Sequence, residues 1–228
     1  MKIGILKTGR APHEVRDTIG DYDDMFTRML ADQGFRFETW AVVDGVFPEG
    51  HEDADGWLIT GSRHGAYEDH PWIPPLEELI RAIHASGRPM IGVCFGHQIM
   101  AQALGGKVEK FSGGWSVGRV DYRFRDGTTR AITAWHQDQV TELPEGAEVV
   151  AESDFCRHAA LLYPGRAYSV QPHPEFGHEM TQALLDHRAP GVVPDDLQDR
   201  ARAGLSAPLD QAAMAAQFAH FLRTKELA

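Results

Sequence analysis

The sequence predicts an α/β protein, a three-layer sandwich in which helices cover both faces of a central, mostly parallel mixed sheet. Strand-like and helix-like segments alternate over about the first hundred residues, as parallel strands joined by crossover helices require. Shorter segments rich in β-branched and aromatic residues follow, which is typical of antiparallel or mixed strands. The chain has 228 residues, 43% of them hydrophobic, and no internal repeat, so we expect one domain over residues 1–228.

The first part of the chain predicts four strands and three helices. The strands span residues 2–6, 35–43, 56–60 and 89–93, and the helices span residues 17–32, 72–86 and 98–104. In the first helix, apolar residues recur at the spacing of one buried face: Tyr22, Met25, Phe26, Met29 and Leu30. Glycines follow the first two helices, as is usual at helix C-termini.

The second part predicts short strands and then helices. The strands span residues 107–111, 117–124, 129–135, 147–152, 159–163 and 167–170. Helices are expected over residues 178–187 and 210–227. Between them, residues 190–208 are rich in proline, glycine and aspartate, which favours a loop that carries one short helix.

The most informative motif is a cysteine between two glycines, in Gly92-Val93-Cys94-Phe95-Gly96. It ends one predicted strand and precedes a helix, the setting of a nucleophile elbow, where glycines allow a sharp turn. At the start of that helix, positive partial charge favours a thiolate. The alternative is an inert cysteine in the core, which is how we interpret Cys156.

A cysteine nucleophile needs a base and a third group that orients the base. His173 and Glu175 fit these roles, because they follow the predicted strand 167–170, and the ends of parallel strands meet at one crevice. A spacing of two residues brings a carboxylate close to the imidazole and selects its tautomer. Pro172 and Pro174 stiffen the segment.

Composition and charge exclude several classes of function. The formal net charge of -11 disfavours a nucleic-acid partner, and no segment is long and apolar enough for a membrane span. The two cysteines argue against a disulfide framework, and with no signal-like N-terminus they favour the cytoplasm. No metal-binding spacing occurs among the 12 histidines, so we expect neither a metal nor another cofactor. His64 and His70 lie in a loop that edges the site or is simply solvated.

Together these motifs resemble the class I glutamine amidotransferase family, most of all the glutaminase domain of GMP synthetase and its free-standing relatives. The resemblance runs from Met1 to about Phe176 and implies a flavodoxin-like fold. Further landmarks agree in order and type: Thr60-Gly61-Ser62, Tyr67-Glu68-Asp69 and Trp135-His136-Gln137-Asp138.

The resemblance implies a set of roles. Cys94 would attack the side-chain amide of L-glutamine, with His173 as general base and then acid, and Glu175 orienting the imidazole. A glutamyl thioester and ammonia would form first, and water would then release glutamate. No cofactor is implied.

Further roles carried over from the family concern the oxyanion and the substrate. The backbone amides of Gly61 and Phe95 would stabilise the oxyanion, and Gln98, His136 and Asp138 would bind the substrate. Phe95 also disfavours the flavodoxin-like proteases and chaperones, which tend to have a histidine directly after the cysteine.

Alternatives to glutamine hydrolysis remain open. The chain stops where GMP synthetase begins its ATP-using half, so ammonia would pass to a separate synthase subunit. Otherwise the protein is a γ-glutamyl peptidase acting on glutathione-like compounds, or a regulatory binding module. The helical segment at about residues 177–228 is longer than the family domain needs, and we expect it to cover the sheet or meet a partner.

Overall fold

The computed structural model describes residues 1–227; residue 228, the last of the predicted C-terminal segment, lies outside the described residues. Within residues 1–227, nine strands form one sheet in the order β2-β1-β3-β4-β11-β10-β9-β6-β7. Their bounds are β1 (Lys2–Leu6), β2 (Arg36–Trp40), β3 (Gly56–Ile59), β4 (Met90–Val93), β6 (Ser116–Phe124), β7 (Thr129–His136), β9 (Glu148–Glu152), β10 (Ala160–Tyr163) and β11 (Ala167–Val170). Two further strands, β5 (Lys107–Lys110) and β8 (Asp138–Glu142), pair with each other.

The core of the sheet is parallel, as the sequence predicts. Strands β2, β1, β3, β4 and β11 run in one direction, and β10, β9, β6 and β7 continue the sheet with antiparallel pairing. The C-terminal ends of β3, β4 and β11 therefore meet at one edge, where the turns after Ile59, Val93 and Val170 lie.

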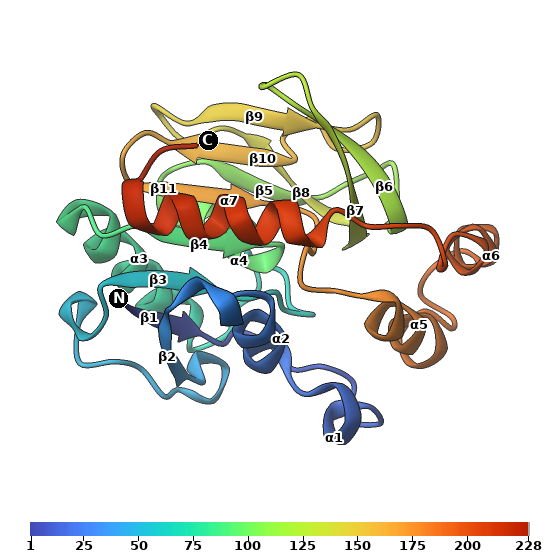
Figure 1. Ribbon diagram of the computed structural model, residues 1–228, viewed down its shortest axis with the longest axis horizontal. Helices are drawn as coiled ribbons and strands as arrows, with labels where there is room; N and C mark the ends of the chain where they lie inside the picture. Colours follow the sequence, from blue (N-terminus) through green and yellow to red (C-terminus); the bar gives the residue numbers. More distant parts are fainter. Residues whose placement is uncertain (228) are drawn as a thin grey trace.

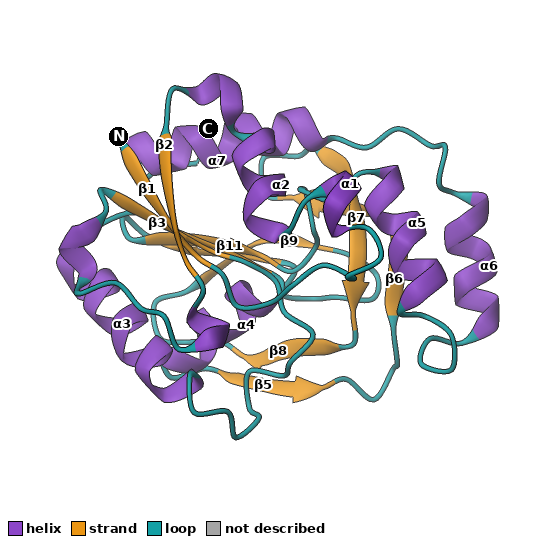
Figure 2. Ribbon diagram, turned by 90° about the horizontal axis from the view of Figure 1, so that it is seen from below, coloured by secondary structure: helices purple, strands orange, loops and turns teal. Residues whose placement is uncertain are grey.

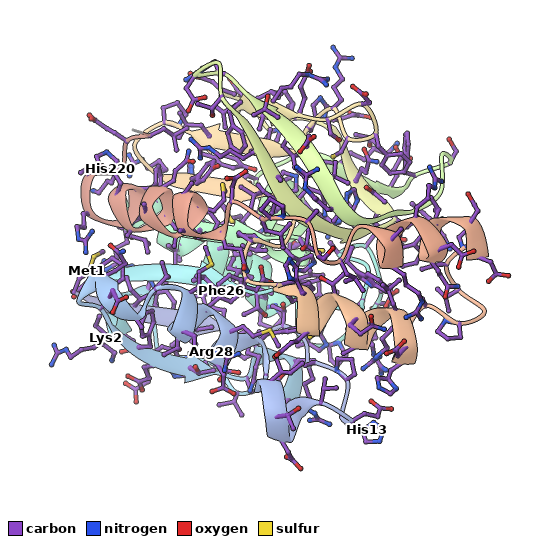
Figure 3. All side chains as sticks on the ribbon, turned by 45° about the vertical axis from the view of Figure 1, so that its right-hand side comes forward. Met1, Lys2, His13, Phe26, Arg28 and His220 are labelled. Atoms are coloured by element: carbon purple, nitrogen blue, oxygen red, sulfur yellow. The ribbon has the colours of Figure 1, made fainter. Side chains whose placement is uncertain are left out.

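Helices cover both faces of the sheet (Figure 1). On one face lie α2 (Tyr22–Met29) and α7 (Gln211–Thr224), and on the other lie α3 (Ile73–Ser86) and α4 (Phe95–Ala103). Phe26 of α2, which Figure 3 labels, belongs to the apolar cluster that α2 and α7 form with the sheet.

Successive side chains of β3 point to opposite faces of the sheet, which shows why helices must cover both faces. Leu58 faces the cluster under α2 and α7, whereas Trp57 and Ile59 face the cluster under α3 and α4, and all three side chains are fully buried. A strand buried on both faces is apolar throughout, as the sequence of β3 is.

Three helices gather at one end of the molecule. They are α1 (Arg16–Ile19), α5 (His178–His187) and α6 (Asp195–Ala203), and Figure 2 shows them beyond the ends of the parallel strands. The predicted helix 178–187 and the short helix within 190–208 are therefore both present. Among residues 1–227, no helix has the length and apolarity needed to cross a bilayer.

The structure corrects the predicted elements at three places. The strand predicted over 35–43 ends at Trp40, and a 3₁₀ turn, Val42–Asp44, follows it. The helix predicted over 17–32 is split, because Gly20 has φ 87° and Asp21 caps a new helix by accepting a hydrogen bond from the Tyr22 N–H. A 3₁₀ turn, Ala31–Gln33, follows it. Strand β8 is absent from the predicted elements, because Asp138 and Gln139 at its start resemble a polar turn and its pairing with β5 spans a long stretch of chain.

Candidate active site

Cys94 occupies the turn between β4 and α4 in an unusual backbone conformation. Its φ of 52° and ψ of -103° lie in a region that costs a non-glycine residue on the order of 1–3 kcal/mol. Neighbouring hydrogen bonds hold it there: the Cys94 N–H donates to the carbonyl of Val170 at 2.9 Å, and the Gln98 N–H donates to the carbonyl of Cys94 at 3.0 Å. The turn therefore has the sharp geometry expected of a nucleophile elbow.

The flanking glycines serve close packing rather than unusual dihedral angles. Neither Gly92 nor Gly96 has a positive φ. A Cβ on Gly92 would lie 2.6 Å from the carbonyl oxygen of Gly96, and a Cβ on Gly96 would collide with the carbonyl oxygen of Ile59. The sequence correctly marks these positions as glycine, but the reason is the near contact of α4 with β3 and β4.

His173 and Glu175 lie directly after β11 and are buried beside Cys94. The Nδ1 of His173 and the Oε1 of Glu175 are 2.7 Å apart, and the Glu175 side chain has no exposed surface. The imidazole stacks on Phe176 with ring centroids 4.0 Å apart, and the His173 N–H donates to the carbonyl of Thr133 at 2.8 Å. Together these contacts hold the imidazole in place: Glu175 at its edge, Phe176 against its face, and Thr133 through the backbone of His173.

Charge around His173 favours the imidazolium. Burial lowers the pKa of His173, but the negative charges of the Glu175 carboxylate and of the Cys94 thiolate outweigh burial and raise the pKa above its ordinary value. Because Nδ1 is occupied by Glu175, Nε2 is the nitrogen left to exchange a proton with Cys94. A thiol, an imidazole and a carboxylate arranged in this order suit acyl transfer.

Gly61, which follows the end of β3, lies beside Cys94 and His173. A Cβ on Gly61 would lie 2.8 Å from Cε1 of His173 and 3.7 Å from Cβ of Cys94, so no larger residue fits. The carbonyl of Thr60 accepts hydrogen bonds from the Thr8 hydroxyl at 2.8 Å and from the Gly96 N–H at 3.2 Å. Because the peptide is planar and trans, the Gly61 N–H points away from that anchored carbonyl.

Two backbone donors are available at this turn. Among the hydrogen bonds of residues 1–227, neither the Gly61 N–H nor the Phe95 N–H has an acceptor. Phe95 is the first residue of α4, where amide groups have no intrahelical partner. Such a pair of free donors beside a nucleophile can stabilise an oxyanion.

A cleft of about 400 Å³ opens in front of Cys94 and His173, and its lining includes the three predicted substrate-binding residues, Gln98, His136 and Asp138. The Gln98 amide nitrogen donates to the carbonyl of Asp138 at 2.9 Å and to Oε1 of Gln171 at 3.1 Å. Both of its donors are therefore used within the protein, which leaves its oxygen for a ligand.

His136 and Asp138 present different charges to the cleft. Burial lowers the pKa of His136 to about 3, so its imidazole is neutral. Partial burial raises the pKa of Asp138, despite a hydrogen bond from the Tyr67 hydroxyl. Partial burial and the adjacent carboxylate raise the pKa of Tyr67 to about 12. Tyr67 lines the cleft too, although the sequence marks it only as a family landmark.

One group near the cleft has the chemistry of a cation site. Donor atoms of His64, Glu68 and His70 lie within 4.8 Å of one another, and His70 Nε2 is 2.7 Å from Glu68 Oε2. Two imidazoles and a carboxylate suit a divalent ion such as zinc. The same atoms also form an internal hydrogen-bonded cluster, which satisfies them without an ion.

Comparisons of the sequence with known proteins point to one family. A family model described as glutamine amidotransferase class-I matches residues 15–188. The chain is 30% identical over 188 residues to gamma-glutamyl peptidase 3 of Arabidopsis thaliana, covering 75% of this chain and 76% of that protein. It is 39% identical over 171 residues to a subunit of the glutamine-hydrolyzing GMP synthase of Archaeoglobus fulgidus, covering 70% of this chain and 86% of that relative.

A solved structure extends the likeness to the whole fold. The crystal structure of a glutamine amido transferase from Methylobacillus flagellatus matches with a TM-score of 0.78 and 22% identity, covering 97% of this chain and 92% of that one. At this identity the match concerns the fold, and it confirms the predicted flavodoxin-like arrangement.

Proposed function

The chain belongs to the class I glutamine amidotransferase family, and we propose that it hydrolyses the side-chain amide of L-glutamine through a thioester on Cys94. One observation carries the proposal: the buried contact of 2.7 Å between His173 Nδ1 and Glu175 Oε1, which leaves the other imidazole nitrogen to exchange a proton with the neighbouring Cys94. A glutamate that orients the base of a cysteine nucleophile is the arrangement that acyl transfer requires.

The reaction proceeds in two halves. His173 takes the proton of Cys94 before the substrate reacts and holds it as the imidazolium, and the thiolate sulfur then attacks the γ-carbonyl carbon of the substrate. The N–H groups of Gly61 and Phe95 stabilise the tetrahedral oxyanion, which collapses as the imidazolium gives its proton to the departing nitrogen. Ammonia leaves, and the glutamyl group remains on Cys94. Water, activated by His173, then attacks the thioester and releases glutamate.

We assign recognition of the glutamyl group to three residues that line the cleft, Gln98, His136 and Asp138. The Asp138 carboxylate pairs with the α-ammonium group, and the Gln98 oxygen accepts a further hydrogen bond. The neutral His136 imidazole donates its Nδ1 proton to the carbonyl of Asp138 at 3.3 Å, so its Nε2, buried with no protein partner among residues 1–227, is the acceptor nitrogen and serves the α-ammonium group.

A second candidate function is hydrolysis of γ-glutamyl peptides. The same acyl-enzyme forms, and an amine replaces ammonia as the leaving group. The cleft supports this candidate, because its lining continues past Cys94 to Arg10, Arg63 and Arg188, which the ammonia of glutamine does not need. For glutamine itself, a separate synthase subunit would receive the ammonia.

The cytoplasm is the location that we propose. Cys94 and Cys156 are both free thiols, and a reducing compartment keeps a catalytic thiol usable.

The experiment measures glutamate released by the purified protein from L-glutamine and, separately, from a γ-glutamyl dipeptide. Acid quenching and mass spectrometry of the protein should show a glutamyl adduct on Cys94. Cys94→Ala should show neither release nor adduct, whereas Cys156→Ala, the matched control, should show both. An unmodified protein that releases glutamate from neither substrate would disprove an autonomous hydrolase and favour a partner-dependent or regulatory role.

A further inference from the structure

A second hollow of about 300 Å³ adjoins the catalytic cleft. Four arginines are among its lining residues: Arg10, Arg16, Arg63 and Arg188. We call it the arginine pocket. Three of these arginines, all except Arg16, also line the cleft that contains Cys94, so the two hollows are neighbours that share part of one wall.

The charge of the arginine pocket contrasts with the rest of the chain. The protein has a net charge of -11, yet no aspartate or glutamate is among the residues that line this pocket. Arg10 pairs with Asp44 and lies 3.7 Å from Asp21. Within residues 1–227, Arg16, Arg63 and Arg188 form no ion pair. Three unpaired guanidinium groups around one hollow indicate an oxyanion ligand, which arginine binds through paired hydrogen bonds.

Four separate segments contribute these arginines. Arg10 follows β1, Arg16 begins α1, Arg63 follows β3, and Arg188 ends α5. Figures 1 and 2 both show α1 beside α5, at the end of the molecule that the exposed His13 marks in Figure 3. The extended C-terminal segment thus forms part of the wall of the cleft.

The arginine pocket is lined by other residues than those assigned to the glutamyl group. Gln98, His136 and Asp138 line the cleft that contains Cys94, and none of them is among the residues that line the arginine pocket. A substrate whose acyl group contacts these three residues at Cys94 can therefore extend its amine side toward the arginines.

We propose that the arginine pocket binds an oxyanion on the amine side of the scissile amide. The preferred substrates are then γ-glutamyl compounds whose amine part carries a carboxylate or a phosphate. This proposal rests on the acyl-enzyme mechanism above and names its substrate class. The C–N bond breaks, the glutamyl group stays on Cys94, His173 gives its proton to the nitrogen, and the anionic amine leaves; one water then releases glutamate.

The test compares substrates that differ only in the anionic group. γ-Glutamylglycine and its neutral glycinamide analogue form one pair, and γ-glutamyl phosphoethanolamine and γ-glutamyl ethanolamine form another. In the unmodified protein, kcat/KM should be about tenfold or more higher for the anionic member of at least one pair, the order expected for a charge-assisted contact. The pair with the larger ratio decides between carboxylate and phosphate.

We expect a ratio closer to one in Arg63→Gln, in Arg188→Gln and in the double variant, because each should lower kcat/KM for the anionic substrate and leave kcat/KM for the neutral substrate unchanged. The matched control is Arg125→Gln, in the turn between β6 and β7, where Arg125 pairs with Glu148 at 2.5 Å; it should leave the ratio unchanged. An equal loss for both members of a pair would mean that the arginines bind the glutamyl α-carboxylate, and the proposal would be wrong.

Calorimetry with Cys94→Ala keeps this test separate from catalysis. That variant should bind γ-glutamylglycine about tenfold more tightly than the glycinamide analogue, and the preference should disappear when Arg63→Gln and Arg188→Gln are added. Hydrolysis of the neutral substrates without any anion preference would refute the arginine pocket alone. Anion preference in binding without any turnover would refute the hydrolase and retain the pocket.

Discussion

The two cysteines of this chain are both buried and free, yet their surroundings differ in almost every respect. Cys94 ends a parallel strand, starts a helix and lies beside an imidazole and an open cleft. Cys156 lies in the turn between β9 and β10, packed in the apolar core, and its N–H donates to the Ser153 hydroxyl at 3.0 Å.

The pKa values of the Cys156 thiol and of His173, the neighbour of Cys94, show the same difference between the two sites. Burial raises the pKa of the Cys156 thiol to about 12, so it stays protonated and inert at neutral pH. Beside Cys94, by contrast, the Glu175 carboxylate and the Cys94 thiolate together favour the protonated form of His173 against the effect of burial. Reactivity therefore comes from the partners that surround a thiol, and burial alone suppresses it.

Removing each thiol is the most direct test of this contrast. Cys94→Ala should lower kcat for glutamine or γ-glutamyl hydrolysis by about 10⁴-fold or more, the scale of losing a nucleophile. Cys156→Ala should keep kcat within about threefold and instead reduce the free energy of unfolding by about 1–2 kcal/mol through a small cavity. Steady-state kinetics and urea denaturation measure the two effects; comparable losses of kcat in both variants would contradict the assignment.

Removing the orienting charge should have the next largest effect. Glu175→Gln should lower kcat by about 10²–10⁴-fold, because the imidazole loses its tautomer and its charge partner. Since Glu175 raises the pKa of His173, its loss lowers that pKa, and the alkaline limb of the kcat/KM profile should move to lower pH. A pH profile across the neutral and alkaline range checks this, and an unmoved alkaline limb would argue against His173 as its source.

Cys94 also differs from Cys156 in lining the open cleft. A substitution of Asp138 tests whether this cleft binds the substrate. Asp138→Asn should raise KM for L-glutamine by about 10–100-fold with a small change in kcat, because a charged contact to the α-ammonium group is lost. Asp154→Asn, at an exposed carboxylate next to the other cysteine, is the control and should leave KM unchanged. A fall in kcat at constant KM would assign Asp138 to chemistry rather than binding.

The smallest expected effect on catalysis concerns the glycines, which flank Cys94 and are absent around Cys156. Gly96→Ala should destabilise the fold by about 1–3 kcal/mol, because its Cβ would collide with the carbonyl of Ile59. Gly204→Ala is the matched control: its Cβ would lie 3.6 Å from the nearest atom, at an ordinary φ of -89°. Equal urea midpoints for the two variants would show that α4 can move away from β3.

Much of the fold was predictable because its signals are local. The apolar runs of β1, β3 and β4 and the helix over residues 178–187 agree with the sequence, since each depends on residues a few positions apart. The break at Gly20 and the strand β8 were missed. A glycine is tolerated within a helical pattern, and a short polar strand is stabilised by a partner that is distant in the chain.

The elbow motif around Cys94, the His173 and Glu175 pair, and through them the family, follow from the sequence without any coordinates, because each motif is made of near neighbours. Which other groups share a cleft with the thiol depends on tertiary structure. Arg10, Arg63 and Arg188 carry no local signal, and they gather around one hollow only when the ends of β1, β3 and α5 converge. Chemistry carried by contiguous residues can be predicted from a sequence, whereas charge assembled from distant segments requires the fold.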